Sequence, residues 1–325
     1  MYIVHRLRQS LSYRSRGLQL QFLKKRAETI RRQAEASLRS TQLRVSENFT
    51  FTIACLVGKK QFIDLLFTLL SFERSVGCLG NLTILSDGSL DEQDVYFLSK
   101  WHENCKVFLK FEDLCDYYHY KPHPTLVSFY NAHYLAPKLF LLNVVQSQSD
   151  CLLLDSDVVF FENPLATASG LVHALKSKIC VCLEDEWESY DPAVIEYGMS
   201  RGANISTKVN TGLVYVPKTA LNSIDWSQHI PSSSLENPHI FTEQSSIAAS
   251  LETVGYSFLP KDKFVVSLRG TGFPRGDYAP FCDIEELYES LVCRHFVTPV
   301  RHLMWLKAFP LLKDKLALSQ EGSFL

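Results

Sequence analysis

Two carboxylates, Asp155 and Asp157, stand in the sequence where they could bind a metal ion together. The apolar run Cys151–Leu154 precedes them, and an aromatic-aromatic-Glu-Asn-Pro sequence ends the block. An apolar run of this length is typical of a buried strand, and side chains at positions i and i+2 of an extended backbone point the same way. Their oxygens suit one hard divalent cation, Mg²⁺ or Mn²⁺. The alternative is a strand that ends in a solvated acidic turn.

This block resembles the Asp-x-Asp signature of nucleotide-sugar glycosyltransferases of the GT-A fold. The resemblance implies that Asp155 and Asp157 hold the metal ion on the diphosphate of a donor sugar, most simply a UDP-sugar. It also implies an α/β fold with a Rossmann-like, mostly parallel sheet flanked by helices. Lys138 lies in the helix expected ahead of the acidic strand, where these enzymes often place a Lys or Arg that contacts donor phosphate. A solvated surface lysine is the other interpretation.

Two later blocks are distantly similar to glycosyltransferase family 8. Asn210-Thr211-Gly212 resembles the Asn-small-Gly strand in which the Asn and the small residue contact the transferred sugar. Glu243-Gln244 resembles the acidic-Gln pair that opens a helix near the reacting carbon. Polar residues at a helix start are also an ordinary capping pattern.

The last block, residues 293–305, resembles the family's closing motif. His295 matches the His that is the third metal ligand, and Arg301 or His302 stands where a Lys meets the diphosphate. Trp305 lies near the closing Trp, whereas the Gly and the Lys-Pro of the family motif are absent. We therefore expect Asp155, Asp157 and His295 to be the metal ligands, with Arg301 on the phosphates.

The elements that must position these residues alternate between strand and helix patterns. Strands are expected at 51–57, 82–85 and 105–109, with helices at 62–72 and about 90–100. Such alternation predicts a parallel sheet with helices on both faces, and ligands bind beyond the carboxyl ends of its strands. Val57, Gly58 and Asp87 fall at those ends and are expected to contact the donor.

The middle of the chain adds a helix at 130–145, a helix at 171–178 and a strand at 179–183. Glu184 follows in an acidic run that could face an acceptor or supply a base, or form a solvated turn. A long loop with several aromatic residues is expected at 186–208.

Charge divides the chain of 325 residues into two parts. Residues 1–50 carry eleven Lys and Arg against three Asp and Glu, a net +8, and the rest carries −10, which leaves −2 overall. An acidic large part argues against nucleic acid as its partner. We expect a basic amphipathic helical extension at 1–50 and a catalytic domain at 51–325. Residues 1–45 could dock on their own domain or another subunit, contact an anionic membrane peripherally, or be partly disordered.

Signals of export or membrane insertion are missing from the sequence. No stretch approaches the about 18 apolar residues of a spanning helix, and the start lacks the apolar core of a secretory signal. The nine cysteines form no paired Cys-x-x-Cys set. We expect reduced thiols and a cytoplasmic protein, peripheral at the membrane if residues 1–45 bind it. The sequons at Asn48, Asn81 and Asn204 would then be accidental.

Together the four blocks predict a metal-dependent glycosyltransferase that moves a sugar to a hydroxyl of a glycan, lipid or protein. If the enzyme inverts the anomeric centre, Glu243 or Glu184 would remove the acceptor proton. If it retains the configuration, Gln244 would sit close to the anomeric carbon, as the family resemblance implies. The sequence leaves both outcomes open.

Two other functions compete with this interpretation. The acidic strand also resembles the nucleophile strand of haloacid-dehalogenase-type phosphatases, in which Asp155 would attack phosphate. Those enzymes need a later Lys and a downstream acidic pair, and they explain neither Asn210 nor His295. The second alternative is a nucleotide-sugar-binding protein that has lost turnover.

Overall fold

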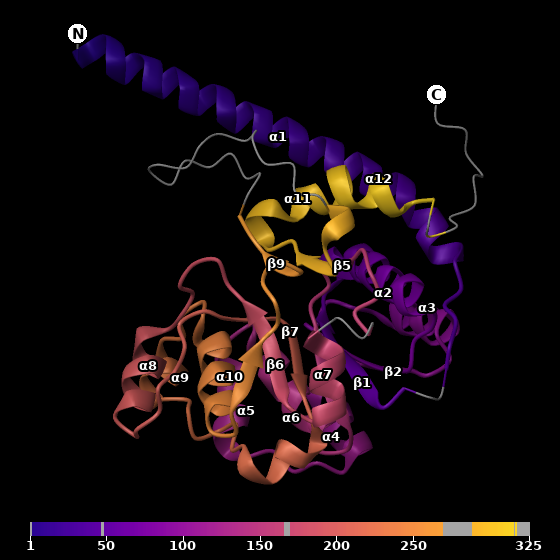
Figure 1. Ribbon diagram of the computed structural model, residues 1–325, viewed down its shortest axis with the longest axis vertical. Helices are drawn as coiled ribbons and strands as arrows, with labels where there is room; N and C mark the ends of the chain where they lie inside the picture. The colour runs from indigo at the N-terminus through magenta and orange to yellow at the C-terminus, as the bar shows by residue number, and fades with distance from the viewer. Residues whose placement is uncertain (1, 47–48, 166–169, 269–287, 315, 317–325) are drawn as a thin grey trace.

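A seven-stranded sheet lies at the centre of the structure (Figure 1). The computed structural model describes residues 2–46, 49–165, 170–268, 288–314 and 316, with side chains of the first helix described from residue 17 onward, residue 19 excepted. The strand order is β3-β2-β1-β4-β7-β6-β8. The strands are β1 (Phe51–Val57), β2 (Asn81–Ser86), β3 (Cys105–Phe108), β4 (Asp150–Leu154), β6 (Cys180–Glu184), β7 (Val209–Val216) and β8 (Tyr256–Phe258).

The sheet is mostly parallel, as predicted. β1 pairs in parallel with β2 and β4, as do β2 with β3 and β6 with β8. Only β7 runs against its neighbours, antiparallel to β4 and β6. Because parallel strands end at the same edge, the loops after β1, β2 and β4 all lie at one edge of the sheet.

Both faces of the sheet are covered, because alternate residues of each strand enter different cores. In β4, Leu152 and Leu154 belong to one core, and Cys151 and Leu153 to the other. The first core includes residues of α1 (Tyr2–Ser40), α2 (Phe62–Val76), α3 (Glu92–Trp101) and α7 (Gly170–Ser177). The second includes residues of α4 (Phe111–Tyr118), α5 (Pro124–Ala132), α6 (Ala136–Gln146), α8 (Pro192–Met199), α9 (Ser232–Glu236) and α10 (Thr242–Glu252).

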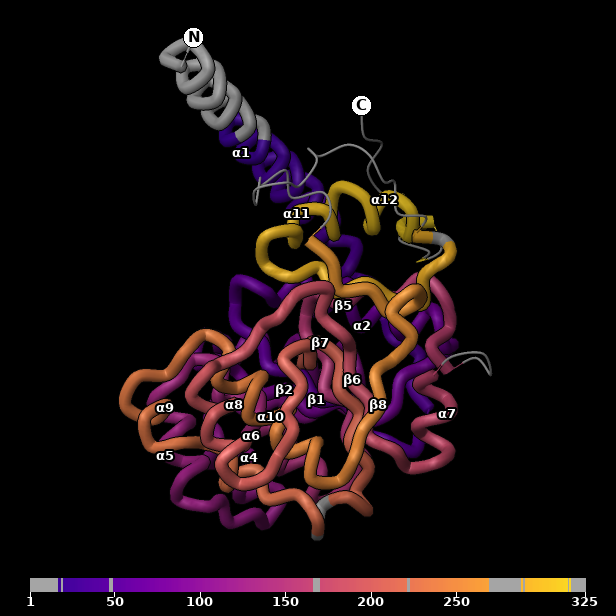
Figure 2. The backbone as a smooth tube through the Cα atoms, turned by 60° about the vertical axis from the view of Figure 1, so that its left-hand side comes forward, coloured from indigo at the N-terminus to yellow at the C-terminus, as the bar shows by residue number. Residues whose placement is uncertain are grey.

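A small second sheet and the helical segment after it lie at one end of the molecule, where that segment packs on α1 (Figures 1 and 2). Its order is β5-β10-β9, formed by β5 (Val158–Phe160), β10 (Cys293–His295) and β9 (Phe264–Val266). The helical segment that follows consists of α11 (Arg301–Leu303), a π-helical turn η5 (Met304–Ala308) and α12 (Phe309–Leu312). Short 3₁₀ turns occur at η1 (Lys59–Gln61), η2 (Lys218–Ser223), η3 (Tyr288–Ser290) and η4 (Thr298–Val300).

The N-terminal extension is helical, as predicted, and its described side chains pack on the rest of the chain. Leu20, Ala27, Ala34 and Leu38 are buried along one side of α1, which packs on α2, α11 and η5. A spacing of about seven residues is typical of a helix that keeps one stripe against a partner. The domain boundary at residue 50 stays a prediction, and Ala27, Ala34 and Leu38 share the first core with β1.

Two sequence expectations about the middle of the chain are wrong. The helix expected at 130–145 is interrupted, because α5 ends at Ala132 and α6 begins at Ala136 with Pro137 in its first turn. Proline is tolerated in the first turn of a helix, where its missing N–H is not needed. The loop expected at 186–208 contains α8, whose first residue is Pro192 and whose N-cap Asp191 accepts from the Ala193 N–H at 3.0 Å. Pro137 and the Asp191-Pro192 pair, which mark the starts of these two helices, were both visible in the sequence.

Membrane-spanning helices, cysteine pairing and sequons are the features that bear on where the protein is located. In the described part of the chain, no helix combines the length and apolar character needed to cross a bilayer. The described cysteines all have free thiols. Of the sequon residues, Asn81 and Asn204 are exposed, and Asn48 lies outside the described residues.

Candidate active site

The acidic pair lies where the large and small sheets meet. Asp155 follows β4, and its backbone N–H donates to the carbonyl of Gly212 on β7 at 2.8 Å. Asp157 immediately precedes β5. The antiparallel pairing of β5 with β10 places His295 opposite Val158, and the Phe296 N–H donates to the carbonyl of Asp157 at 2.8 Å. Strand pairing thus brings the end of the chain to the acidic motif.

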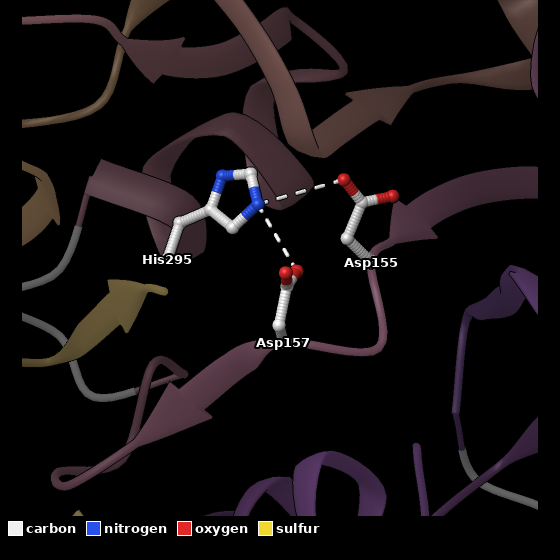
Figure 3. A group of neighbouring side chains, drawn as sticks. All are labelled: Asp155, Asp157 and His295. Carbon is white, nitrogen blue, oxygen red and sulfur yellow. Dashed lines mark ion pairs between the residues drawn. The ribbon is translucent and has the colours of Figure 1, made fainter. Parts of the chain in front are cut away.

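The structure brings together the three residues predicted as metal ligands. The His295 ring faces both carboxylates, with Nε2 3.1 Å from Asp157 Oδ1 and 3.6 Å from Asp155 Oδ2 (Figure 3). One ligand atom from each residue lies within 4.8 Å of the others. The Asp155 side chain is 26% exposed, whereas those of Asp157 and His295 are buried. The cluster is therefore open toward solvent at Asp155.

Asn210 orients the imidazole ring. His295 Nδ1 lies 2.8 Å from Asn210 Oδ1, which also accepts from the Gly212 N–H at 2.9 Å. An amide oxygen can only accept, so Nδ1 is the donor and Nε2 is the nitrogen that faces the carboxylates. The Asn210 Nδ2 group donates to Asp185 Oδ1 at 2.9 Å, which fixes the orientation of the amide. A ring nitrogen held by such a partner is typical of metal-ligating histidines.

Gly212 makes room for this ring. A Cβ at residue 212 would lie 2.2 Å from His295 Nδ1, far inside van der Waals contact. The glycine in the Asn-Thr-Gly block is therefore required by the close approach of His295, and not by an unusual backbone angle.

A cation binds each carboxylate of the pair. Lys138 Nζ lies 2.8 and 2.9 Å from the two oxygens of Asp155, and Arg301 donates from Nε and Nη2 to Asp157 Oδ2 at 2.9 and 2.5 Å. Burial alone would raise the pKa of Asp157, but Arg301 and His295 outweigh it and hold this pKa well below its usual range. For Lys138 burial lowers the pKa, and the charges of Asp155 and Glu243 more than offset it.

Glu243, in the first turn of α10, lies beside the lysine. Thr211 Oγ1 is within 3.0 Å of Lys138 Nζ and 3.4 Å of Glu243 Oε2, so the hydroxyl connects the two side chains. Burial raises the pKa of Glu243 to about 7, and the charge of Lys138 opposes this shift. A carboxyl with that pKa can gain or lose a proton near neutrality, as a general acid or base must.

Asp185, a residue that the sequence analysis did not select, joins the site through Gln244. The Gln244 Nε2 group donates to the Ser189 carbonyl at 2.8 Å and lies 3.3 Å from Asp185 Oδ2. Burial raises the pKa of Asp185 to about 6, and His295 opposes the shift. The expected residue Glu184 is the half-buried last residue of β6. The pairing of β6 with β7 shifts register between Cys182 and Leu183, a change that sequence does not reveal.

Val57, Gly58 and Asp87 lie together at the same sheet edge. The Asp87 N–H donates to the Val57 carbonyl at 3.0 Å, and a Cβ at residue 58 would lie 2.0 Å from Asp87 Oδ2. Asp87 Oδ1 accepts from the backbone and hydroxyl of Ser89 at 2.9 and 2.5 Å. The group therefore forms the ends of β1 and β2 beside the strand that carries Asp155.

Of the basic residues Arg294, Arg301 and His302 near His295 in the sequence, Arg301 binds the acidic pair, through Asp157. The Arg294 guanidinium lies over the rings of Tyr288 and Phe296, at 5.5 and 4.8 Å from their centroids. His302 is buried, and burial lowers its pKa to about 4, with the charge of Lys24 on α1 acting in the same direction. Arg301 therefore lies at the acidic pair, and its expected contact with donor phosphate stays a prediction.

Helix α2 holds residues 155–160, which carry the acidic pair, through two side-chain hydrogen bonds that the sequence analysis missed. The Thr68 hydroxyl donates to the carbonyl of Ser156, between the two aspartates, at 2.8 Å. The Ser71 hydroxyl accepts from the Phe160 N–H on β5 at 3.1 Å. These polar residues are buried in a mostly apolar helix, and that contrast was the available signal.

Comparison with known proteins gives the name of the fold. No family model matches the sequence, and no curated protein matches it significantly. The structure is similar to the galactosyltransferase LgtC solved with donor and acceptor sugar analogs, with a TM-score of 0.50 and 12% identity over 84% of this chain and 98% of that one. This likeness confirms the GT-A fold expected from the sequence.

Two further solved structures are similar at lower scores. Mouse xyloside xylosyltransferase 1 matches with a TM-score of 0.48 and 12% identity, over 78% of this chain and 98% of that one. The bifunctional glycosyltransferase WbbM matches with a TM-score of 0.48 and 12% identity, over 84% of this chain. The match spans 52% of the WbbM chain, about half its length.

Proposed function

We propose that this protein is a metal-dependent glycosyltransferase that moves a sugar from a nucleoside-diphosphate sugar, most simply a UDP-sugar, to an acceptor hydroxyl. The observation that supports it is the cluster of Asp155, Asp157 and His295 at the carboxyl edge of a GT-A sheet, with Lys138 and Arg301 on its two sides. A metal ion bound to a diphosphate presents a positive and a negative group side by side. The carboxylates suit the metal ion, and the two cations suit the diphosphate.

Mn²⁺ or Mg²⁺ fits the residues present. Two carboxylates and an imidazole with its free nitrogen toward them form a donor set that Mn²⁺ accepts, and Mg²⁺ also takes carboxylates. Asp155, Asp157 and His295 would hold the ion. When bound, the ion offsets negative charge that develops on the leaving diphosphate.

The remaining residues would bind and orient the donor. Lys138 and Arg301 would contact the diphosphate, since each already binds a carboxylate oxygen at the metal cluster. Asn210 and Thr211 would contact the transferred sugar, because they lie on β7 between His295 and Glu243. Val57, Gly58 and Asp87 would hold the nucleoside at the neighbouring strand ends.

Two residues are candidates at the reacting carbon. Glu243 has a pKa raised by burial to about 7, which suits a base that removes the proton of an acceptor hydroxyl in an inverting transfer. Gln244 instead would lie at the anomeric centre in a retaining transfer. Glu184 is the alternative base. Proton NMR of the first product formed would assign the stereochemistry, because the α and β anomers give different couplings.

The decisive experiment is an assay of what the protein releases. Purified protein is incubated with nucleoside-diphosphate sugars, Mn²⁺ and a panel of glycan, lipid and protein acceptors, and nucleoside diphosphate and free phosphate are measured separately. A glycosyltransferase releases the nucleoside diphosphate, and a haloacid-dehalogenase-type phosphatase releases phosphate. A binding protein without turnover releases neither, yet its melting temperature rises with a selective donor. Either of the last two results would refute the proposal.

The acceptor and the place where the protein acts belong to the same proposal. The acceptor would be a hydroxyl of a glycan, lipid or protein. Cytoplasmic placement, and contact of residues 1–45 with a membrane or another subunit, stay predictions.

A further inference from the structure

The strongest unassigned feature is a buried polar junction between the N-terminal helix and the segment that carries Arg301. Asp64 on α2 is its centre. Its Oδ1 atom accepts from Arg31 Nε on α1 at 2.9 Å and from Trp305 Nε1 on η5 at 2.9 Å. Trp305 is 241 positions from Asp64 in the sequence, and it shares the Asp64 Oδ1 atom with Arg31 of α1.

The junction is well isolated from water. The Asp64 side chain is 6% exposed and that of Arg31 is 18% exposed, and Trp305 is buried. Arg31 Nη2 also donates to the Lys60 carbonyl at 2.5 Å, so its guanidinium is fixed on two sides. A charge pair in such surroundings is screened little by salt, and removing one partner leaves the other charge buried and unpaired.

The junction leads directly to the metal cluster. Trp305 and Arg301 are four residues apart in one continuous helical segment, and Arg301 binds Asp157. Burial raises the pKa of Asp64, while Arg31, Trp305 and Arg301 all act to lower it, so both guanidinium groups stabilise its charge. The segment turns as a π-helix at Met304–Ala308, a geometry that needs support from its surroundings.

We propose that Arg31 is a positioning residue for the active site: through Asp64 and Trp305 it holds Arg301 in place for the donor diphosphate. This inference rests on the proposed function and gives the N-terminal helix a part in it. The sequence analysis assigned residues 1–45 to docking, assembly or membrane contact. The contacts of Arg31 add a role in donor binding.

The test compares Arg31→Ala with Arg32→Ala. Arg32 is a matched control, since it lies next to Arg31 and pairs with Glu28 at 3.1 Å while its side chain is 76% exposed. Full-length proteins are titrated by calorimetry with UDP and with inorganic pyrophosphate in saturating Mn²⁺. We expect Arg31→Ala to weaken both ligands about 10-fold, because Arg301 contacts only their shared diphosphate, and Arg32→Ala to change neither by more than about twofold.

Combination with Arg301→Ala separates positioning from general destabilisation. If Arg31 acts through Arg301, Arg31→Ala has no further effect on pyrophosphate affinity once Arg301 is alanine. Losses that multiply in the double variant would overturn the inference, as would equal affinities of Arg31→Ala and Arg32→Ala. Wild-type protein that binds neither ligand with Mn²⁺ would refute the proposed function itself, and the inference with it.

A second variant and a second measurement cover a poorly folding Arg31→Ala. Trp305→Phe keeps an aromatic ring against Phe67 and Phe309 and removes the indole N–H that reaches Asp64, together with one ring of the side chain. We expect it to weaken pyrophosphate binding several-fold. Amide hydrogen exchange needs no ligand, and both variants should exchange faster than Arg32→Ala in residues 301–308. Unchanged exchange there would contradict the role of the junction.

Discussion

The two carboxylates of the acidic motif belong to differently built halves of the site. Asp155 lies on the main sheet, is partly exposed, and pairs with Lys138 from the helix before its own strand. Asp157 is buried and depends on His295 and Arg301, both from the end of the chain. The first half is local in sequence, and the second is assembled from distant parts.

This difference separates two tasks that one motif performs. The partly exposed carboxylate of Asp155 can meet a ligand from solvent, and its buried partner Lys138 keeps the Thr211 hydroxyl and the charge of Glu243 beside it. The buried carboxylate cannot lose its partners without leaving a charge uncompensated. Asp157 should therefore support the fold as well as bind metal, whereas Asp155 should act mainly in binding.

The largest expected effect is the loss of stability when Asp157 is replaced, which tests whether Asp157 supports the fold more than Asp155 does. Asp157→Asn should lower the free energy of unfolding by about 3 kcal/mol, because Arg301 loses its buried partner. Asp155→Asn should lower it less, because Lys138 keeps the Thr211 hydroxyl and the charge of Glu243 as neighbours. Both variants should weaken Mn²⁺ binding about 100-fold or more. Urea unfolding and Mn²⁺ titration measure the two effects, with the exposed Asp113→Asn as control. Equal destabilisation by both changes would break the comparison.

The pH dependence of the unfolding free energy tests the half of the site that lies at the main sheet, because the buried acid Glu243 belongs to it. Its folded pKa is about 7 against an ordinary 4.5, so between these values the folded protein binds a proton that the unfolded chain does not. The stabilisation is complete below pH 4.5 and is lost as the pH rises through 7, about 3 kcal/mol in all. Glu243→Gln should remove this part of the pH dependence of unfolding, and the exposed Glu236→Gln should keep it. Identical profiles for the two variants would contradict the buried-acid assignment.

The contact between the halves is tested at Gly212. Gly212→Ala would place a Cβ 2.2 Å from His295 Nδ1, so the ring must move away from Asn210. We expect a loss of about 2 kcal/mol in unfolding free energy and weaker Mn²⁺ binding. Gly202→Ala is a control without a steric neighbour, although its φ of +83° adds backbone strain. Normal Mn²⁺ affinity in Gly212→Ala would show that His295 does not need its observed position.

The smallest effect concerns the support beneath the acidic loop. Thr68→Val keeps the side-chain shape and removes the hydrogen bond to the Ser156 carbonyl, which leaves that carbonyl unsatisfied. The unfolding free energy should decrease by about 1 to 2 kcal/mol. Ser99→Ala, which removes an exposed hydroxyl on α3, should be neutral. A neutral Thr68→Val would mean that the loop is held by its strand contacts alone.

The parts that sequence predicts well are those whose signal is local. The run Cys151–Leu154 predicts the buried strand that the structure shows, because its apolar character is visible in one short stretch, and the metal site expected at the aspartates after it stays a prediction. His295 and Arg301 were assigned through the family resemblance. Spacing alone would not have joined them to residues about 140 positions earlier.

The parts that sequence does not predict depend on register and on contacts between elements. Asp185 instead of Glu184 faces Asn210, and a register shift between β6 and β7 precedes it. Asp64 reads as a polar interruption of an apolar helix, and only the packing of α1 and η5 gives it partners. The antiparallel direction of β7 also follows from tertiary connectivity, since an isolated strand has no directional signal.

The long sequence separation of these contacts has a consequence for how the protein folds. Asp157 is 144 residues from Arg301, and Asp64 is 241 residues from Trp305. Closing such large loops is slow and comes late, after the local strand-helix units have formed. During synthesis Asp157 must remain hydrated until residues 295–301 leave the ribosome. A chain that stops before residue 295 would lack His295 and Arg301, the two partners of Asp157, and would leave this carboxylate unpaired at the junction of the two sheets.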